Sequence, residues 1–258
     1  MREVVDGVFE VSLGFVNVHL VVTDDGVVLV DTGLPRRSAR IVKALHGIRK
    51  QLGDVRTILL THHHFDHIGN VADLRQRSGA RVFAHAADAP VITGAIRPPT
   101  PSRWLARVAS RVMTAEPSKI DQLITGTESE PLPGFTALHT PGHTRGHVSY
   151  LLDRAGGVLF AGDAAAGKNK GQVGSAPRMA AADLAELDRS VIRLATHDFE
   201  HAVFGHGPAV TGRAVDRFRE YAATLSPSDA SDADDADDAD DADDADDSAA
   251  AGENGDDK

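Results

Sequence analysis

Residues 61–67 read Thr-His-His-His-Phe-Asp-His, directly after an apolar run that is predicted to be a β-strand. Alternate residues of a strand point to the same side, so His62 and His64 are expected to share a face. A loop that leaves the strand can then turn Asp66 and His67 toward the same point. Neutral imidazole nitrogens and carboxylate oxygens are ligands that suit zinc, iron or manganese. This stretch therefore predicts a metal site.

Three further ligand candidates stand beside predicted strands and next to glycine. His143 lies in a Thr-Pro-Gly-His turn, and Asp163 and His206 each follow closely on a predicted strand. Glycine permits close approach of the backbone at such positions. Together with the first four candidates, these residues are enough for two metals that share one bridging carboxylate.

The predicted strands and helices alternate after an opening meander. Strands are expected at 16–22, 27–30, 56–60, 81–84, 135–139, 147–152, 158–161 and 202–204, and helices at 35–52, 71–79, 184–194 and 209–223. This mixture predicts a layered α/β arrangement in which two sheets carry helices on their outer faces.

A proline-rich segment interrupts this order. Seven of the twelve prolines fall between Pro90 and Pro133, so the segment is expected to be largely irregular. It contains an apolar and a basic stripe at helical spacing, formed by Trp104, Leu105, Val108 and Val112 and by Arg103, Arg107 and Arg111. These stripes indicate a packed surface helix with a solvated basic face. The alternatives are a cap that selects the substrate, or a surface for a homodimer partner or lipid.

The composition excludes several classes of protein. The chain has 258 residues and no cysteine, which excludes disulfide scaffolds, Cys-ligated zinc fingers and thiol nucleophiles. No run of 18 apolar residues is present, so we expect no membrane span. The N-terminus lacks the apolar core and the cleavage site of a signal peptide, which predicts a cytoplasmic location.

The net charge of −11 belongs to a tail. Residues 229–258 hold 15 acidic residues and one basic residue, whereas the preceding residues hold 23 acidic and 26 basic ones, a net of +3. Five Ala-Asp-Asp repeats fill 233–247, and such a segment is expected to be disordered. We therefore predict a folded domain at 1–225 and a disordered acidic tail at 226–258. A net charge of +3 on residues 1–228 gives only a weak attraction to a phosphate backbone, so we expect no nucleic-acid partner.

The order His62-x-His64-x-Asp66-His67, His143, Asp163 and His206, preceded by Val30-Asp31-Thr32-Gly33, resembles the metallo-β-lactamase superfamily. The resemblance extends from residue 1 to about residue 223. It implies an α/β fold, a four-layer αβ/βα sandwich with the metals at one edge between the two sheets. Residues 1–225 would then form a metallo-β-lactamase-like hydrolase domain.

The resemblance also implies a role for each site residue. The first metal would be held by His62, His64 and His143, the second by Asp66, His67 and His206, and Asp163 would bridge both; Asp31, Thr61 and His147 would orient the ligands by hydrogen bonds. His63 falls at a variable position of the motif and is not expected to be a ligand, while His85 and His139 are weaker candidates for a direct role. The expected cofactor is two Zn²⁺, with iron or manganese as alternatives.

The expected reaction is hydrolysis of a small-molecule substrate by a hydroxide that bridges the two metals, with Asp66 orienting the nucleophile. The segment 140–147, Thr-Pro-Gly-His-Thr-Arg-Gly-His, is similar to the glyoxalase II and lactonase-like branches, which hydrolyse thioesters or lactones. The folded chain is predicted to end near Ala223, which leaves no room for the helical domain by which glyoxalase II binds glutathione. Lys168 and Lys170 are candidates for binding a substrate carboxylate.

Three other functions stay open. A persulfide dioxygenase with one iron shares the first part of the motif, a cytoplasmic β-lactam hydrolase shares the fold, and a metal-binding regulatory protein needs no activity. Phosphodiester hydrolases of the superfamily that act on RNA or DNA carry a large inserted domain, for which this chain has no room.

Overall fold

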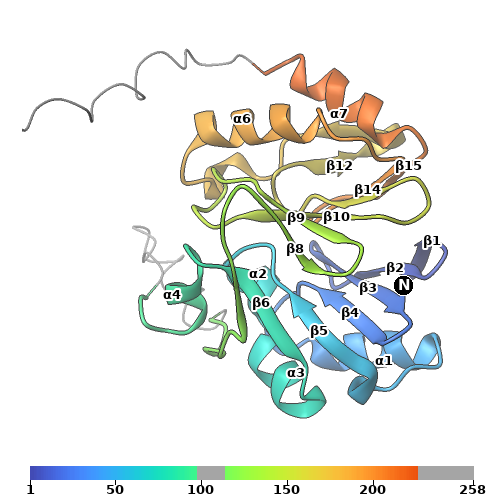
Figure 1. Ribbon diagram of the computed structural model, residues 1–258, viewed down its shortest axis with the longest axis vertical. Helices are drawn as coiled ribbons and strands as arrows, with labels where there is room; N and C mark the ends of the chain where they lie inside the picture. Colours follow the sequence, from blue (N-terminus) through green and yellow to red (C-terminus); the bar gives the residue numbers. More distant parts are fainter. Residues whose placement is uncertain (98–113, 226–258) are drawn as a thin grey trace, which may run out of the picture. The chain divides into compact units, whose positions relative to one another are not determined.

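A seven-stranded sheet forms the first half of the fold (Figure 1). Its strands follow the order of the chain: β1 (Arg2–Val5), β2 (Val8–Ser12), β3 (Asn17–Thr23), β4 (Gly26–Val30), β5 (Val55–Leu59), β6 (Arg81–His85) and β7 (Gln122–Ile124). Strands β1 to β4 form an antiparallel meander, and β4 to β7 are parallel.

The computed structural model describes residues 1–97 and 114–225. The predicted stripes at 103–112 and the predicted acidic tail at 226–258 lie outside these residues.

A six-stranded sheet forms the second half, in the order β15-β14-β11-β10-β9-β8. Its strands are β8 (Glu128–Leu132), β9 (Phe135–His139), β10 (Val148–Leu152), β11 (Val158–Phe160), β14 (His201–Val203) and β15 (Val210–Thr211). Only β11 and β14 pair in parallel among these strands. A separate hairpin is formed by β12 (Ala166–Lys168) and β13 (Gln172–Gly174).

Helices cover the outer face of each sheet, as Figure 1 shows. Helices α1 (Ser38–Gly47) and α3 (Val71–Ser78) pack on the seven-stranded sheet, and α6 (Leu184–Leu194) and α7 (Ala214–Ala222) pack on the six-stranded sheet. The short helices α2 (Phe65–Ile68) and α4 (Ala89–Ile92) follow β5 and β6. The layers run helix, sheet, sheet, helix, which confirms the predicted four-layer αβ/βα sandwich.

Strand β4 shows why the sheets stack in this way. Val27 and Leu29 pack into the cluster under α1 and α3, while Val28 and Val30 pack into the cluster between the sheets. Because successive side chains point to opposite faces, a strand that is apolar at every position must be buried on both sides. The inter-sheet core also contains Tyr150, whose hydroxyl donates a 2.7 Å hydrogen bond to the carbonyl of Leu60. This bond fixes the start of the histidine-rich loop against β10.

Several predicted elements were wrong in their extent. The helix predicted at 35–52 spans only Ser38–Gly47, since the chain turns at Arg49, whose φ is 57°. The last helix begins at Ala214 rather than near 209, because β15 pairs with β14 first. Strands β7 and β8 lie within the proline-rich segment that was expected to be irregular. Pro131 fits in β8 because β8 is an edge strand with an irregular register between Ser129 and Leu132.

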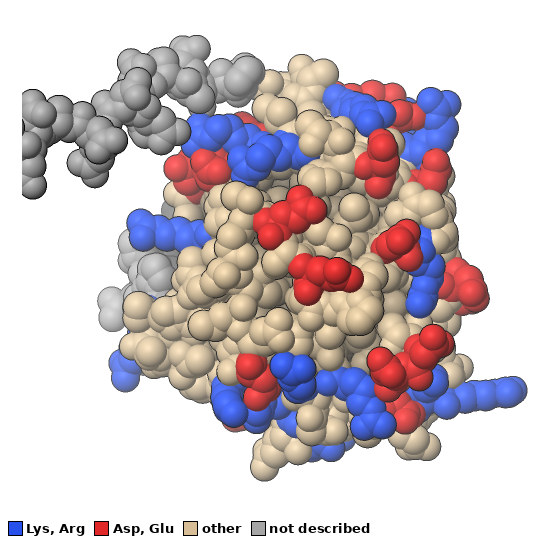
Figure 2. Space-filling view, in the orientation of Figure 1, with Lys and Arg blue, Asp and Glu red and all other residues tan. Residues whose placement is uncertain are grey.

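Charged side chains mark the outer helix layers. On the face drawn in Figure 2, Lys and Arg gather with Asp and Glu at the top and bottom of the view, and the band between carries scattered groups of Asp and Glu among uncharged residues. Within the part of the chain that the structure describes, no helix is long and apolar enough to cross a lipid bilayer.

Candidate metal centre

The candidate ligands stand near the ends of strands from both sheets. His62 follows β5 by three residues, His64 is the N-cap of α2, and the single turn of α2 then presents Asp66 and His67. The six-stranded sheet contributes the other side of the site: His143 lies in the turn between β9 and β10, Asp163 follows β11, and His206 follows β14. The fold thus brings together seven side chains that are separated by up to 144 positions in the sequence.

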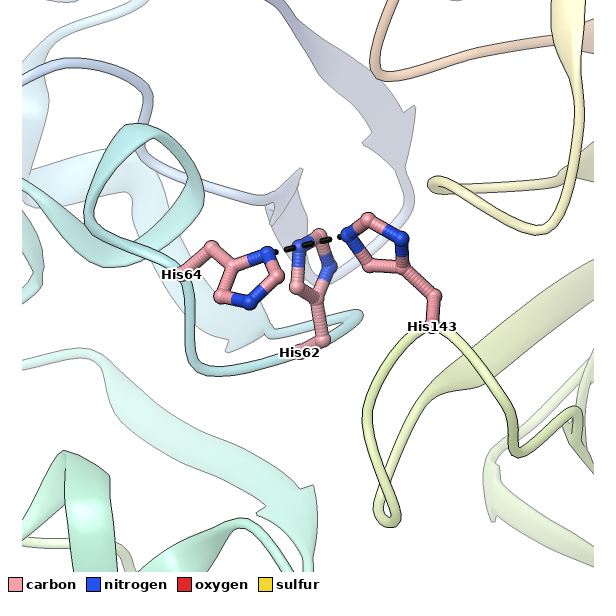
Figure 3. Close-up of side chains that lie close together, drawn as sticks. All are labelled: His62, His64 and His143. Carbon is pink, nitrogen blue, oxygen red and sulfur yellow. Dashed lines mark hydrogen bonds between the residues drawn. The ribbon is translucent and has the colours of Figure 1, made fainter. Parts of the chain in front are cut away.

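Three histidines form the first group. His62, His64 and His143 each offer a ring nitrogen within 4.8 Å of the others, and Figure 3 shows their rings turned toward one another. The Nε2 of His143 lies 2.9 Å from the Nδ1 of His64. Burial, with a smaller contribution from neighbouring histidines, lowers the pKa of all three: to about 4 for His64, to about 3 for His143 and well below 6.5 for His62. These imidazoles are neutral at neutral pH, which is the form that binds metals.

Asp66, His67 and His206 form the second group, again with ligand atoms within 4.8 Å. The Oδ2 of Asp66 lies 3.6 Å from the Nε2 of His206 and 4.0 Å from that of His67. Burial lowers the pKa of His67, but the charges of Asp163, Asp31 and Asp66 outweigh it and raise the pKa to about 10. In the metal-free protein the imidazole of His67 is therefore protonated at neutral pH and gives this group a positive charge.

Asp163 lies between the two groups. Its Oδ1 is 3.4 Å from the Nε2 of His67, and its Oδ2 is 3.3 Å from the Nε2 of His143 and 3.2 Å from that of His206. The side chain is almost fully buried, and the histidines around it lower its pKa although burial acts in the opposite direction. A carboxylate placed in this way can contact cations in both groups.

Unpaired buried atoms provide a test of whether cations fit here. Among the described residues, His62 Nε2, His67 Nε2 and Asp163 Oδ1 are atoms of the cluster that are buried without a hydrogen-bond partner. A buried polar group left unpaired costs about 1–3 kcal/mol. Cations bound between these atoms would accept their lone pairs. A set of imidazole nitrogens and carboxylate oxygens suits zinc, and it also suits iron and manganese. The residues fit metal ions.

Asp31 and Thr61 orient two of the imidazoles. Asp31 accepts 2.8 Å hydrogen bonds from the backbone N–H and the hydroxyl of Thr61 and from the Nδ1 of His67. Since the Thr61 proton goes to Asp31, its oxygen accepts from the Nδ1 of His62 at 3.0 Å, which leaves the Nε2 lone pair of His62 facing the cluster. Asp31 holds an unusual φ of 60°, a strained position that these bonds stabilise.

His147 acts on the backbone of Asp163 rather than on its side chain. The Nε2 of His147 accepts a 2.9 Å hydrogen bond from the backbone N–H of Asp163. Its Nδ1–H therefore donates to the hydroxyl of Thr140, at 2.8 Å. The weaker candidates are placed elsewhere: the rings of His85 and His139 stack on each other at 4.1 Å and belong to neither ligand group.

Sequence reasoning missed the residues that hold His206 and the loops. The Nδ1 of His206 donates to the carbonyl of Phe15 at 2.8 Å, and the two rings are stacked. The side chain of Asn17 donates to the carbonyls of Phe204 and Gly207. Asp88, which is buried beside His63, also escaped notice. These contacts join distant parts of the chain, and no local pattern signals them.

A cleft of about 810 Å³ opens on the ligand cluster. Four candidate ligands line it, together with Phe15, Phe65, Ala166, Gly167, Lys168, Ser175, Ala176, Pro177, Ala180 and Gly207. The ammonium group of Lys168 donates to the carbonyl of Ser175 at 2.7 Å. Lys170 lies in the exposed turn between β12 and β13 and does not line the cleft. The structure thus brings Lys168, but not Lys170, to the cleft.

Comparisons with known proteins agree with this geometry. A family model described as the metallo-beta-lactamase superfamily matches residues 11–206, which contain all seven candidate ligands. A probable metallo-hydrolase of Bacillus subtilis is 28% identical over 235 residues, which cover 82% of this chain and 88% of that protein. A hydroxyacylglutathione hydrolase of Pseudomonas syringae is 32% identical over 164 residues, which cover 62% of this chain but only 54% of that enzyme.

Solved structures give the same result for the fold. A metallo-beta-lactamase family protein from Thermus thermophilus superposes with a TM-score of 0.65 at 28% identity, covering 84% of this chain and 79% of that one. A metallo-beta-lactamase from Cronobacter sakazakii superposes with a TM-score of 0.64 at 23% identity, covering 80% of each chain.

Proposed function

The chain belongs to the metallo-β-lactamase superfamily and is a metal-dependent hydrolase, and from this we propose that it uses two metal ions to hydrolyse a thioester, lactone or other carbonyl ester. The observation that carries the proposal is the position of Asp163, whose two carboxylate oxygens contact histidines of both ligand groups. His62, His64 and His143 would hold one cation. Asp66, His67 and His206 would hold the other, and Asp163 would contact both.

A pair of divalent cations, when bound, polarises the carbonyl under attack and lowers the pKa of water so that hydroxide is available near neutral pH. The protein supplies orientation. Asp31 and Thr61 fix the rings of His67 and His62, and the carbonyl of Phe15 fixes that of His206. Preset rings need little rearrangement during the reaction, which is the main source of electrostatic catalysis.

Asp66 is the residue to which we assign a direct catalytic role. It lines the cleft and sits beside His67 and His206, so its carboxylate faces the space that the substrate enters. A carboxylate there can accept a hydrogen bond from the attacking water and hold it in line with the substrate carbonyl. It can then take up the proton of that water and give it to the leaving group.

The walls of the cleft favour a carbonyl substrate over a phosphodiester. Apart from the candidate ligands, the lining is mainly phenylalanine, alanine, glycine and proline, and Lys168 is the one lysine or arginine that the described residues contribute to it. A single ammonium group can pair with one carboxylate, whereas phosphodiester recognition relies on several positive groups. The likeness to a hydroxyacylglutathione hydrolase, which covers 54% of that enzyme, supports a thioester as one of these substrates.

The test is a substrate panel on protein of known metal content. Thioesters, lactones, β-lactams and phosphodiesters are offered to the full chain loaded with zinc, manganese or iron, with oxygen uptake followed in parallel. We expect the thioester or lactone to be cleaved fastest, and activity to disappear after chelation and return with added metal. Oxygen uptake on a persulfide by a one-iron form, without ester cleavage, would replace the proposal with the dioxygenase function.

A further inference from the structure

Asp88 is a buried carboxylate that belongs to neither ligand group. It lies between β6 and α4, and only 2% of its surface is exposed. Its Oδ2 accepts from the backbone N–H of His63 at 3.0 Å and from the hydroxyl of Thr144 at 2.7 Å, and its Oδ1 accepts from the N–H of Gly146 at 2.8 Å. One carboxylate thus joins the loop after β5 to the loop between β9 and β10.

N-capping of the helix that follows Asp88 does not explain why its carboxylate is buried. An aspartate before a helix usually caps it by accepting from the first backbone amides. Asp88 occupies the N-cap position of α4, yet its side chain makes no capping bond; only its carbonyl accepts, from Val91 and Ile92. A buried carboxylate costs several kcal/mol unless it is well hydrogen-bonded. Here the two loops supply those bonds.

The packing around Gly146 shows how tightly the loop is pressed onto Asp88. A Cβ atom at position 146 would stand 2.6 Å from the backbone nitrogen of Asp88 and 2.7 Å from its Oδ1. Real Cβ atoms do not approach so closely, so any residue other than glycine would push the loop away. The distance between the loop and Asp88 is therefore fixed by contact as well as by hydrogen bonds.

The bonded positions stand next to three candidate ligands. His63 lies between His62 and His64, and Thr144 follows His143 directly. The Nδ1 of His64 and the Nε2 of His143 face each other across the two loops, 2.9 Å apart (Figure 3). In the second group His67 is bonded to another carboxylate, Asp31, which also supports His62 of the first group through Thr61.

We propose that Asp88 is a positioning residue that clamps the two loops together and thereby sets the metal affinity of the three-histidine group. Asp66, His67 and His206 depend on it far less. This inference rests on the ligand set in the proposed function, and it gives the three-histidine group a support that the second group does not share. Loss of an outer hydrogen-bond partner typically weakens metal binding about 10- to 100-fold.

The test is a Co²⁺ titration of the metal-free full chain, followed by visible absorption. The His143→Ala variant first identifies the binding phase that belongs to the three-histidine group. Thr144→Val then removes one bond to Asp88 at nearly constant volume, Asp88→Asn removes the charge, and Thr144→Ser keeps the hydroxyl as the matched control. None of the last three variants changes a candidate ligand.

We expect Thr144→Val and Asp88→Asn to weaken the identified phase about 10- to 100-fold, with the remaining Co²⁺ binding within about threefold of wild type. Thr144→Ser should keep the Co²⁺ affinity of the identified phase within about threefold of wild type. Equal weakening of all Co²⁺ binding, or none in either variant, would overturn the inference while the ligand set stands. If His143→Ala left Co²⁺ binding unchanged, the ligand set itself would be wrong, and the proposed function would fail together with this inference.

Discussion

Gly205 offers a direct probe of the space between the ligands. It precedes His206, and a Cβ atom added there would collide with Asp163 Oδ1 and stand 2.6 Å from the Cε1 of His67. Ordinary contact begins at 3.4 Å, so His67 would have to retreat by roughly 0.8 Å. Metal–ligand distances tolerate only about 0.2 Å. The φ of Gly205 is not in the left-handed region, so alanine fits the backbone there and only the added methyl group perturbs the site.

We therefore expect Gly205→Ala to weaken binding of the cation that contacts His67 and Asp163 by at least about 10- to 100-fold, or roughly 1.4–2.8 kcal/mol. Metal titration of the metal-free protein measures this, and ester turnover at limiting metal should fall in parallel. Gly53→Ala is the control, since a Cβ there meets nothing within 4 Å. Overpacking alone costs about 1–3 kcal/mol of stability, so the melting temperature of both metal-free variants is recorded as well. Wild-type affinity for both cations in Gly205→Ala would refute the proposed geometry.

Three more predictions concern the same site. Asp163→Ala should lower metal content and hydrolysis together, and full turnover with two bound metals would exclude a shared carboxylate. The metal affinity of the site that contains His67 should rise by up to about tenfold per pH unit between about pH 6 and about pH 9. The pKa of His67 is about 10, so the cation must displace a proton from its imidazole. The metal affinity of the binding phase that is lost in His143→Ala should not change over that pH range, since its imidazoles are neutral. An equal pH dependence of the two affinities would contradict the assignment of a protonated His67 and a neutral three-histidine group. Lys168→Ala should raise KM for carboxylate-bearing substrates severalfold and leave neutral esters unchanged, and unchanged constants for both would remove Lys168 from substrate binding.

The metal cluster could be predicted because its residues carry their signal locally. Four candidates fall within 61–67, and the others sit beside short apolar strands next to glycine. A fold in which such strands meet at one edge brings their ends together, and the structure places His62, Asp163 and His206 in this way. The two-sided burial of β4 follows from its uninterrupted apolar run for the same reason.

The supporting contacts could not be predicted because they depend on tertiary structure. Asp88 precedes Ala-Pro, a context typical of a helix start, and only the folded chain shows its carboxylate turned toward loops 25 and 58 positions away. Phe15 looks like an ordinary hydrophobic residue, yet it is 57% exposed and its carbonyl orients His206 across 191 positions. Strand β8 was missed because Pro131 argues against a strand unless it is known to lie at an edge.

The central claim, two metal ions that share Asp163, is tested most directly by titrating Zn²⁺ into the metal-free full chain while recording ester hydrolysis and bound metal in the same samples. The account predicts that activity reaches its plateau only when two Zn²⁺ are bound per chain. It also predicts that Asp163→Ala never reaches this plateau. Full activity at one bound metal, with no further rise as a second ion binds, would contradict it.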